Sequence, residues 1–538
     1  MTPLAIILII ASAGFAISTW LRVPVIPLLM AGGFAASYFG FALEGEAAGS
    51  TLEFGLAFLV FAAGLELSPR RFRHEARQVA WVAALQFIIC GLAAFLVCRA
   101  LGFGLIASTY MGFAVSASST LVVIQHLRRQ GQMFQPFGRL VTGVLLLQDL
   151  AIVIVFVVLA AVPGGASEVA IRLAWFGLAA GLAVFAHFKI VPWLLSKMHT
   201  DDELLLLAGL ATLFLCLGIT SFLQLPLVVG AFLAGFALAA FPVNGLLRGL
   251  LGSLSSFFMA VFFTALGMLV QIPSWQILGQ AVALSLVIVI LTPIVVSAIA
   301  EFTGQSTRTG VESGLLLTQS SELGIVLGLA GVQAGQLTGN DFSVLALVAG
   351  ITMTLTPLIA TDQMTWRLMH WHPGRRNRSA MAKFSDHVLV LGFGSSGMWV
   401  VKPLRDAGHR ILVVDDDTAV IEDLALIGIP CLRGDGSDAR LLNFVGASKA
   451  KLVIASLPRL ADLLKVIRAA PDVPVVARVF EEYEAAAIRR AGGMAVLNSE
   501  AAVGAFMDWF NTREAPHTTT NGLKKTPDEE PPAQKEQS

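Results

Sequence analysis

The sequence predicts a polytopic α-helical membrane protein with about 13 spans, followed by a C-terminal α/β Rossmann-like domain. Three observations predict this. Apolar runs of spanning length extend from Met1 to about Ala360, several of these runs resemble one another at a fixed offset, and a strand–glycine turn–helix–strand pattern follows Phe384. Apolar residues make up 56% of the chain and charged residues 13%, which is far from the composition of a soluble globular protein.

A membrane-spanning helix needs roughly 20 mostly apolar residues. Thirteen segments fit, with centres near residues 11, 34, 58, 90, 116, 150, 178, 211, 233, 261, 288, 322 and 350. Several are short or interrupted by glycine, so the count carries a margin of one. The first segment lacks the basic start and the cleavage site of a signal peptide, and we interpret it as a span.

Basic residues gather in alternate loops, and cytoplasmic loops are the ones that carry Lys and Arg. The N-terminus is therefore predicted to be periplasmic and the C-terminal domain cytosolic, in a bacterial inner (plasma) membrane. Arg99 and Arg172 are exceptions. The basic loops hold Arg22, Arg70–Arg77, Arg128 and Arg129, Lys189 and Lys197, Arg248, Arg308, and Arg375–Arg378.

The formal net charge of zero gives no indication of a nucleic-acid partner. The four cysteines show no metal-ligand spacing, and a disulfide framework is not expected.

Residues in three pairs of spans repeat at an offset near 202. A shift of seven spans reverses orientation, so spans one to six and eight to thirteen would be inverted copies, as in secondary transporters. The matches are Pro24, Gly33 and Phe34 with Pro226, Gly235 and Phe236; Gly112, Ser118 and Ser119 with Gly314, Ser320 and Ser321; and, one residue out of phase, Val60–Leu65 with Phe263–Met268.

Two polar clusters, Ser116–Thr120 and Thr318–Glu322, lie at mid-membrane depth in the fifth and twelfth spans. If the helices break there, unwound carbonyls and helix ends can hold a cation. The alternative is that these small residues only allow close helix packing. The candidate ligands for an ion or proton are Ser118, Ser119, Thr120, Gln319, Ser320 and Glu322.

Asp149 follows Gln148 inside the apolar run Val141–Val158. A carboxylate at the bilayer centre costs roughly 2.5–3.5 kcal/mol, so its presence indicates a function. A desolvated carboxyl holds its proton until a cation arrives, and this competition is the minimal chemistry of antiport. Alternatively, Asp149 only bonds the broken helices. Glu322 is a ligand, a second proton site, or a partner of the half-helix ends, whereas Glu53 and Glu66 are expected near the interface.

Five sequence motifs resemble the Kef-type members of the monovalent cation:proton antiporter-2 family. The resemblance implies the inverted-repeat antiporter fold, K⁺ as the transported ion, and an ion site formed by Gln148 and Asp149. Related sodium/proton antiporters with an Asp-Asp pair there and a Lys on a later span tend to be electrogenic. Because this chain has Gln in the first position and no Lys in spans ten to thirteen, the resemblance implies one-for-one K⁺/H⁺ exchange. The motifs are Gly64–Leu67, Ser118–Thr120, Leu147–Asp149, Gly230–Gly235 and Ala265–Met268.

The glutathione-gated members of that family carry an acidic loop before the tenth span. Here the corresponding stretch, Val243–Gly249, contains no acidic residue. The resemblance therefore does not extend to glutathione gating.

The cytosolic domain begins with a predicted strand, His387–Leu391, a glycine-rich turn, a helix, and a second strand, Ile411–Val414. A GxGxxG turn in this setting is typical of dinucleotide sites, because the phosphate lies on the helix N-terminus and an acidic residue holds the ribose. The alternative is a glycine-rich turn without a ligand. The candidate cofactor residues are Gly392, Phe393, Gly394, Ser395, Ser396, Gly397, Asp415 and Asp416.

This domain resembles the nucleotide-binding (RCK/TrkA-N) half of domains that regulate potassium transport. The resemblance implies an adenine nucleotide, NAD(H) or AMP, with Asp435 at the adenine and Arg478 at a phosphate. It also implies a homodimer and leaves an ancillary regulatory subunit open. The chain shows no catalytic constellation, so we interpret the domain as a sensor and not as an enzyme.

We therefore expect an exchanger domain at 1–365, a linker at 366–384, the nucleotide-binding domain at 385–511 and a disordered tail at 512–538. The hypothesis is a K⁺/proton antiporter that works by alternating access among membrane lipids and is regulated by nucleotide. One alternative is a Na⁺/H⁺ antiporter. Others are a ligand-gated potassium channel, whose filter motif is absent, and a sensor without transport.

Overall fold

The computed structural model describes residues 3–21, 23–41, 46–66, 76–133, 135–193, 202–239, 243–270, 273–371, 385–394 and 397–497. The chain forms two compact units, Met1–Ser379 and Ala380–Ser538, which divide inside the predicted linker. The first six residues of that linker are helical, as part of α17 (Asp362–Trp371). The tail predicted to be disordered lies outside the described residues.

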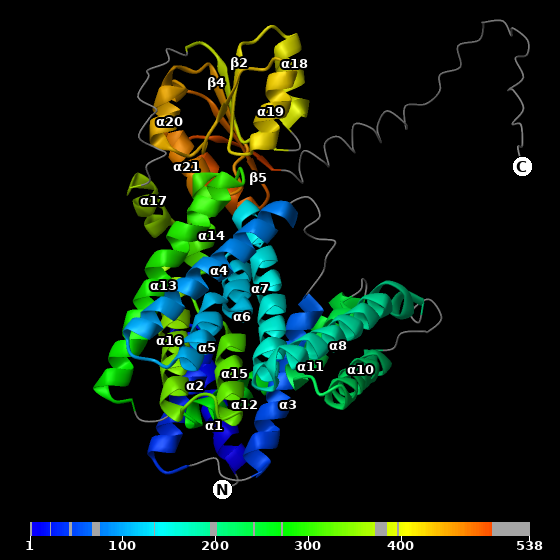
Figure 1. The fold of residues 1–538 in the computed structure, drawn as a ribbon. Helices are drawn as coiled ribbons and strands as arrows, with labels where there is room; N and C mark the ends of the chain where they lie inside the picture. The colour runs from blue at the N-terminus through cyan, green and yellow to red at the C-terminus, as the bar shows by residue number, and fades with distance from the viewer. Residues whose placement is uncertain are drawn as a thin grey trace, which may run out of the picture. The chain divides into compact units, whose positions relative to one another are not determined.

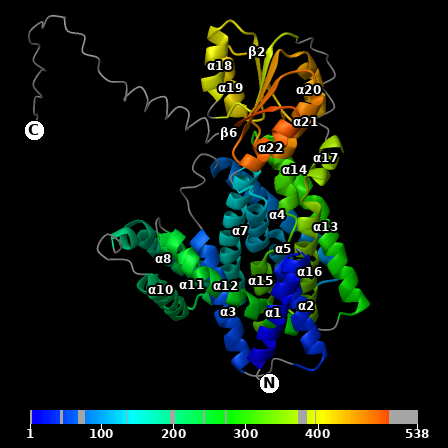
Figure 2. The same cartoon turned by 180° about the vertical axis from the view of Figure 1, so that it is seen from behind.

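The first unit is helical (Figures 1 and 2), and each of the thirteen predicted centres lies within a helix. The helices before α17 are α1 (Pro3–Leu21), α2 (Val25–Tyr38), α3 (Glu46–Glu66), α4 (Ala76–Ala100), α5 (Leu105–Ser116), α6 (Thr120–Arg129), α7 (Pro136–Ala161), η2 (Val162–Gly164), α8 (Gly165–Phe185), η3 (Ala186–Ile190), α10 (Asp202–Phe222), α11 (Leu227–Leu238), α12 (Val243–Met268), α13 (Trp275–Phe302), α14 (Thr307–Leu316), α15 (Glu322–Gln333) and α16 (Gly339–Ile359).

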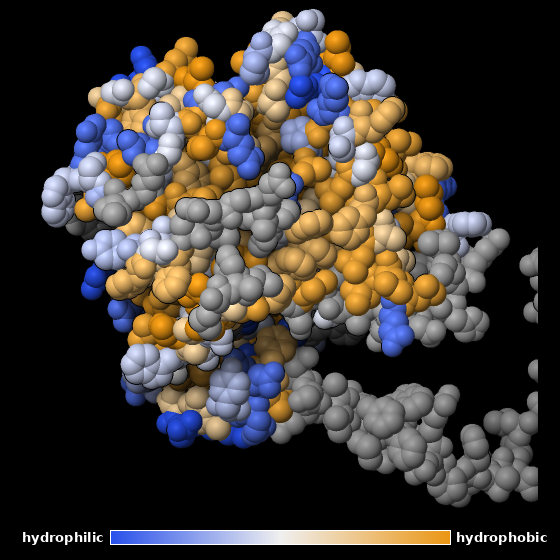
Figure 3. Space-filling model, turned by 90° about the horizontal axis from the view of Figure 1, so that it is seen from below, coloured by the Kyte–Doolittle hydropathy of each residue, from blue (hydrophilic) through white to orange (hydrophobic). Residues whose placement is uncertain are grey.

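Within the described ranges, six helical stretches are long and apolar enough to cross a membrane. Shorter apolar helices accompany them, so the count of thirteen spans stays a prediction. Large apolar side chains such as Trp20, Phe222 and Trp275 are exposed, and wide hydrophobic areas lie open on the face in Figure 3. The six are Ala76–Ala100, Leu105–Arg128, Pro136–Trp193, Glu203–Phe222, Trp275–Phe302 and Gly339–Ile359.

Both predicted breaks are present. Ala117, between α5 and α6, has extended backbone, and Ser119 caps α6 by accepting a hydrogen bond from Val122 N at 3.3 Å. In the second break, Ser321 caps α15 in the same way, accepting from Leu323 N at 3.1 Å. A serine at each N-cap satisfies one of the helix's free N–H groups. Figure 1 shows α5 followed upward by α6 but α14 followed downward by α15, as an inverted pair requires.

The repeat is also visible in how helices begin. Pro24 precedes α2 with φ −58° and ψ 141°, and Pro226 precedes α11 with φ −56° and ψ 142°. Each proline fixes an extended backbone at the start of the helix that follows it.

Glycines allow two matched helix crossings. A Cβ on Gly33 of α2 would lie 2.0 Å from Thr264 O of α12, and one on Gly235 of α11 would lie 2.1 Å from Phe61 O of α3. Only glycine permits backbones to approach this closely. Because Gly33 and Gly235 share the repeat offset, the two crossings are equivalent.

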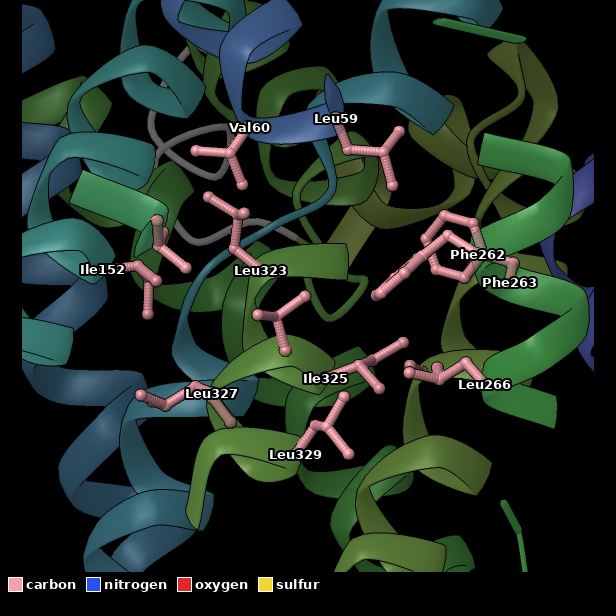
Figure 4. Close-up of a cluster of buried hydrophobic side chains, with 14 of the residues drawn as sticks. Leu59, Val60, Ile152, Phe262, Phe263, Leu266, Leu323, Ile325, Leu327 and Leu329 are labelled. Atoms are coloured by element: carbon pink, nitrogen blue, oxygen red, sulfur yellow. The ribbon is translucent and has the colours of Figure 1, made fainter. Parts of the chain in front are cut away.

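The membrane helices form two groups. α1–α3 pack with α10–α12, here called the panel bundle, and α4–α7 pack with α13–α16, here called the core bundle. Each predicted repeat gives three spans to each bundle. Apolar side chains fill the interface between them (Figure 4), where residues of α15 meet residues of α12 and α3: Leu323, Ile325, Leu327 and Leu329 with Phe262, Phe263, Leu266, Leu59 and Val60.

The second unit is a parallel six-stranded sheet in the order β3-β2-β1-β4-β5-β6. Separate apolar clusters cover its two faces, as a parallel sheet requires. The sheet order reverses between β1 and β4, where nucleotides bind in such folds. The elements are β1 (Val388–Leu391), α18 (Gly397–Asp406), β2 (Ile411–Asp415), α19 (Thr418–Leu426), β3 (Cys431–Arg433), α20 (Ala439–Phe444), η5 (Ala447–Lys449), β4 (Leu452–Ala455), α21 (Leu460–Ala469), β5 (Val475–Val479), α22 (Glu482–Arg490) and β6 (Met494–Leu497).

Candidate functional site

Side chains from two neighbouring helices hold the first break. The backbone N–H of Ser118 donates to Gln148 Oε1 of α7 at 3.0 Å. Gln148 Nε2 in turn donates to Gln86 Oε1 of α4, and Gln86 Nε2 donates to Ser116 O at 3.0 Å. Two polar groups of the broken span, Ser116 O and Ser118 N, are therefore satisfied by side chains, as burial in a membrane demands.

The second break is held in a corresponding way. The N–H of Ser320, the repeat equivalent of Ser118, donates to Thr352 Oγ1 of α16 at 3.1 Å. Ser118 and Ser320 also tie the two breaks together. Ser118 Oγ donates to Leu317 O at 2.8 Å, and Ser320 Oγ donates to Ala114 O at 3.2 Å. The two broken spans thus form one hydrogen-bonded crossing.

Asp149 lies at this crossing and is 1% exposed. Its Oδ2 accepts a hydrogen bond from Thr120 Oγ1 at 2.8 Å. Its Oδ1 is buried and has no hydrogen-bond partner among the described residues, and no Lys or Arg of those residues forms an ion pair with it. The structure therefore brings together two of the predicted residues, from the end of the break and from the following span.

The second break contributes two more side chains. Glu322 Oε1 accepts from Leu121 N, near the start of α6, at 3.4 Å, while Glu322 itself begins α15. Its carboxylate thus lies at the N-termini of two half-helices, where negative charge is favourable. Gln319 Nε2 donates to Ser119 O at 3.4 Å.

Three buried oxygens at the crossing lack a donor in the described part of the chain: Asp149 Oδ1, Glu322 Oε2 and Gln319 Oε1. An unsatisfied buried acceptor costs about 1–3 kcal/mol. A proton on a carboxyl group or a bound cation would satisfy these oxygens, and either arrangement also neutralises negative charge. The described residues hold no cluster of three His, Cys, Asp or Glu that would suit a transition metal.

Sequence reasoning missed Gln86 and Thr352. Gln86 lies in the middle of an apolar helix, and a lone amide at that depth is a signal for a hydrogen-bonding role. Thr352 lies two residues past the repeat equivalent of Gln148, so the offset indicated its neighbourhood. Glu66 contacts Arg128 at 3.9 Å. Three residues of the predicted basic loop that follows Glu66, Arg70, Arg71 and Arg73, lie outside the described residues.

The glycine-rich turn of the second unit follows β1 as predicted. Gly392 has φ +76° and Gly394 has φ +49°, a left-handed backbone that favours glycine. A Cβ on Gly392 would also lie 2.7 Å from Ser456 O. The predicted cofactor residues Ser395 and Ser396 lie outside the described residues, whereas Gly397 begins α18.

Asp415 at the end of β2 organises this turn. Its Oδ2 accepts from Phe393 N at 2.6 Å and from Gly394 N at 3.2 Å, and its Oδ1 accepts from Asp417 N at 2.9 Å. The carboxylate therefore lies beside the backbone that would meet a phosphate. Asp416 follows it directly in the chain.

The loop after β3 reaches the same edge of the sheet. Gly434 N donates to Asp415 O at 2.8 Å, and a Cβ on Gly436 would lie 3.2 Å from Leu391 Cβ at the end of β1. Between these glycines, Asp435 Oδ1 accepts from Ser437 N at 2.8 Å. Arg478 of β5 instead lies over the Phe480 ring, 5.0 Å from its centre. Asp435 thus lies in a loop that reaches the turn, whereas the described residues show no contact between Arg478 and the turn.

Comparison with known proteins supports both units. A family model described as "Sodium/hydrogen exchanger, transmembrane" matches residues 5–361, and the TrkA-N domain model matches residues 388–499. The second unit is therefore a nucleotide-binding TrkA-N domain with a Rossmann-like sheet.

Two curated relatives match most of the chain. The putative K(+) efflux antiporter KefB of Alkalimonas amylolytica is 25% identical over 83% of this chain and 70% of its own length. The glutathione-regulated potassium-efflux system protein KefC of Salmonella schwarzengrund is 28% identical over 82% of this chain and 73% of its own. The resemblance to Kef-type proteins is therefore confirmed.

A solved structure shares the membrane fold. The sodium proton antiporter MjNhaP1 of Methanocaldococcus jannaschii matches with a TM-score of 0.52 at 14% identity, covering 68% of this chain and 96% of that one. The match to the exchanger model covers well over half of the chain. The protein therefore belongs to the sodium/hydrogen exchanger family of transmembrane proteins and carries a C-terminal TrkA-N domain.

Proposed function

We propose that the protein exchanges K⁺ for protons, and that the two compete for Asp149. The observation that supports this most strongly is a set of three buried oxygens, on Asp149, Gln319 and Glu322, for which the described part of the chain supplies no donor. Protonated Asp149 needs no cation. Once the proton leaves, its carboxylate and the neighbouring oxygens attract one. A site that accepts either charge, but not both, couples the two fluxes.

Alternating access is the second part of the proposal. The two bundles are each densely packed within themselves, and the apolar residues of α15, α12 and α3 separate them (Figure 4). An apolar interface has few hydrogen bonds to break when one bundle moves past the other. The carboxylates lie in the core bundle, so its movement would carry the site from one side of the membrane to the other.

K⁺ is proposed as the cation because the curated relatives are named as potassium-efflux proteins. Na⁺ is the second candidate, and the name of the matching family model favours it. Gln148 does not help to choose between K⁺ and Na⁺, because both ends of its amide already bond to Ser118 and Gln86. We therefore assign the cation to oxygens of Asp149, Gln319 and Glu322, with Gln148 as a support of the break.

We further propose that an adenine nucleotide, NAD(H) or AMP, binds the TrkA-N domain and regulates exchange in a homodimer. The supporting observation is that Asp415, the glycine-rich turn and the Asp435 loop meet at one edge of the sheet. Regulation requires that the nucleotide bind more tightly to one transport state than to the other.

The test of exchange is proton flux in proteoliposomes that enclose a pH-sensitive dye, with K⁺, Na⁺ or Rb⁺ added outside. K⁺ should dissipate a pH gradient in vesicles with the unaltered protein and fail to do so with Asp149→Asn. Glu53→Gln, at an exposed position of α3, is the matched control and should retain flux. Full flux through a folded Asp149→Asn protein would contradict the proposal, and flux with Na⁺ alone would select the second candidate.

A further inference from the structure

Gln86 is buried at 1% exposure in the middle of α4, and both ends of its amide are used. Its Oε1 accepts from Gln148 Nε2, and its Nε2 donates to Ser116 O at 3.0 Å. Gln148 Oε1 accepts from Ser118 N. The two amides therefore form a continuous brace around Ala117, from the last residue of α5 to the unwound backbone.

We propose that Gln86 is a positioning residue for the cation site, acting through Gln148 on the first break. Holding the Gln148 amide fixes the N–H of Ser118, and Ser118 is two residues before Thr120, whose hydroxyl bonds Asp149. Among the described residues Gln86 forms no hydrogen bond with Asp149, and it is linked to the break through Ser116 and Gln148. It sets where the hydroxyl of Thr120 and the adjacent carbonyls lie relative to the carboxylate. This inference rests on the proposed exchange function and names a further residue for it.

The second repeat provides an internal comparison. There the N–H of Ser320 is held by Thr352 Oγ1, and the same hydroxyl donates to Val348 O of its own helix at 2.8 Å. A threonine fixed to its own helix needs no further support. Glutamine has a longer and more flexible side chain, so the break beside Asp149 needs a second residue to keep the amide in one orientation.

Loss of the brace has a defined consequence. Without Gln86, the buried Gln148 Nε2 loses its acceptor. An unsatisfied buried donor is unfavourable, so rotation of the amide toward another acceptor becomes more favourable. Any rotation that points its NH₂ group toward the crossing brings partial positive charge near Asp149 and opposes cation binding. The expected defect is therefore in the apparent cation affinity more than in the maximal rate.

The experiment compares three variants of the full chain in proteoliposomes. Gln86→Met keeps the length of the side chain and removes both hydrogen bonds, and should raise the apparent KM for K⁺ about tenfold, the effect of losing a buried hydrogen bond. Gln78→Met is the matched control. Gln78 is also a hydrogen-bonded glutamine of α4, but its partners are Thr303 O and Gln305, so the KM should be unchanged.

Gln86→Glu should give a pH-dependent KM for K⁺, which a simple loss of packing would not produce. While protonated, the new carboxyl can donate to Ser116 O and accept from Gln148, as the glutamine does. Once ionised it has no proton to donate and faces a carbonyl oxygen. The KM of Gln86→Glu, divided by that of the unaltered protein at each pH, should therefore approach one at low pH and rise with pH.

A second measurement is independent of transport. Hydrogen–deuterium exchange of a peptide containing Ser116–Thr120, in lipid nanodiscs, should be faster in Gln86→Met than in Gln78→Met or the unaltered protein. An unchanged KM together with unchanged exchange would overturn the inference. If the unaltered protein shows no cation-dependent flux, the proposed function fails, and the inferred transport role of Gln86 fails with it. Exchange alone then still decides whether the brace exists.

Discussion

Thr120 donates its hydroxyl hydrogen to Asp149 Oδ2 at 2.8 Å, and this bond joins the first residue of α6 to the middle of α7. The bond leaves the other carboxylate oxygen without a partner among the described residues. Thr120 therefore holds one oxygen of the carboxylate and leaves the other to the proton or cation of the proposed exchange.

Replacement of Thr120 by valine should weaken cation binding. A hydrogen bond to a charged group contributes about 1.5–3 kcal/mol, so the apparent KM for K⁺ should rise by roughly tenfold or more as the carboxylate loses its orientation. Thr120→Ser keeps the hydroxyl and should remain close to the unaltered protein. Proton flux in proteoliposomes at graded K⁺ measures both, and equal KM values for the valine and serine variants would contradict the assignment.

The glycine crossings predict a clear difference in stability. Alanine at Gly235 would place a Cβ 2.1 Å from Phe61 O, so the helices must separate, whereas Gly279 of α13 has open space around it. Gly235→Ala should reduce stability by about 1–3 kcal/mol, as overpacking does, and Gly279→Ala should not. Thermal unfolding in detergent, followed by loss of the monodisperse fraction, measures the two variants. Equal melting temperatures would show that the crossing adjusts.

Asp415 should control nucleotide binding. Its carboxylate accepts three backbone hydrogen bonds in and beside the glycine-rich turn. Asp415→Asn presents an NH₂ group to some of these donors, and NAD(H) or AMP should bind at least about tenfold more weakly to it. Binding of labelled nucleotide to the full chain checks this, with Asp472→Asn, an exposed position in the turn after α21, as the control. Unaltered affinity in Asp415→Asn would place the nucleotide elsewhere.

The second unit should lose stability in mild acid. Burial, and next the charge of Arg410, lower the pKa of His387, against smaller opposite effects of the Val445 backbone and then of Asp386. A depressed pKa in the folded state means that the unfolded chain binds more protons below about pH 6.5. Stability is therefore complete above that pH and falls as the pH drops toward the folded pKa. His387→Gln should flatten this slope.

Urea unfolding of the full chain, followed by deuterium exchange of the β1 peptide, measures the slope between about pH 5.5 and pH 7.5. If the His387→Gln protein and the unaltered protein lose stability equally over this range, His387 is not the cause of the acid sensitivity.

Patterns of local spacing allowed much of the fold to be predicted. The apolar runs, the shared offset and the turn after His387–Leu391 each depend on residues that lie close together or repeat regularly. The helix breaks at Ala117 and after Leu317 were predicted from polar clusters. The strand ends were predicted less well. The strands predicted at His387–Leu391 and Ile411–Val414 are Val388–Leu391 and Ile411–Asp415, because local patterns locate strand ends poorly.

The interactions within the site could not be predicted in the same way. Gln86 and Gln148 are 62 positions apart and meet only because α4 packs on α7. Likewise, Ser118 reaches Leu317 across 199 positions. A single sequence, taken without an alignment of its relatives, contains no record of such contacts. From the sequence, Gln148 was therefore predicted to be an ion ligand. In the structure its amide bonds to Ser118 and Gln86, so we propose that it supports the break.

The ties between the two breaks have a consequence for biosynthesis. α6 has 10 residues and α15 has 12, lengths of about 15 and 18 Å, and neither can cross a bilayer of about 30 Å alone. Ser118 Oγ bonds Leu317 O, and Leu121 N bonds Glu322. These partners leave the ribosome about 200 residues later, roughly 10–40 s at ordinary elongation rates. The first half of the transporter must therefore wait in the membrane, with its break incompletely bonded, until the second half arrives.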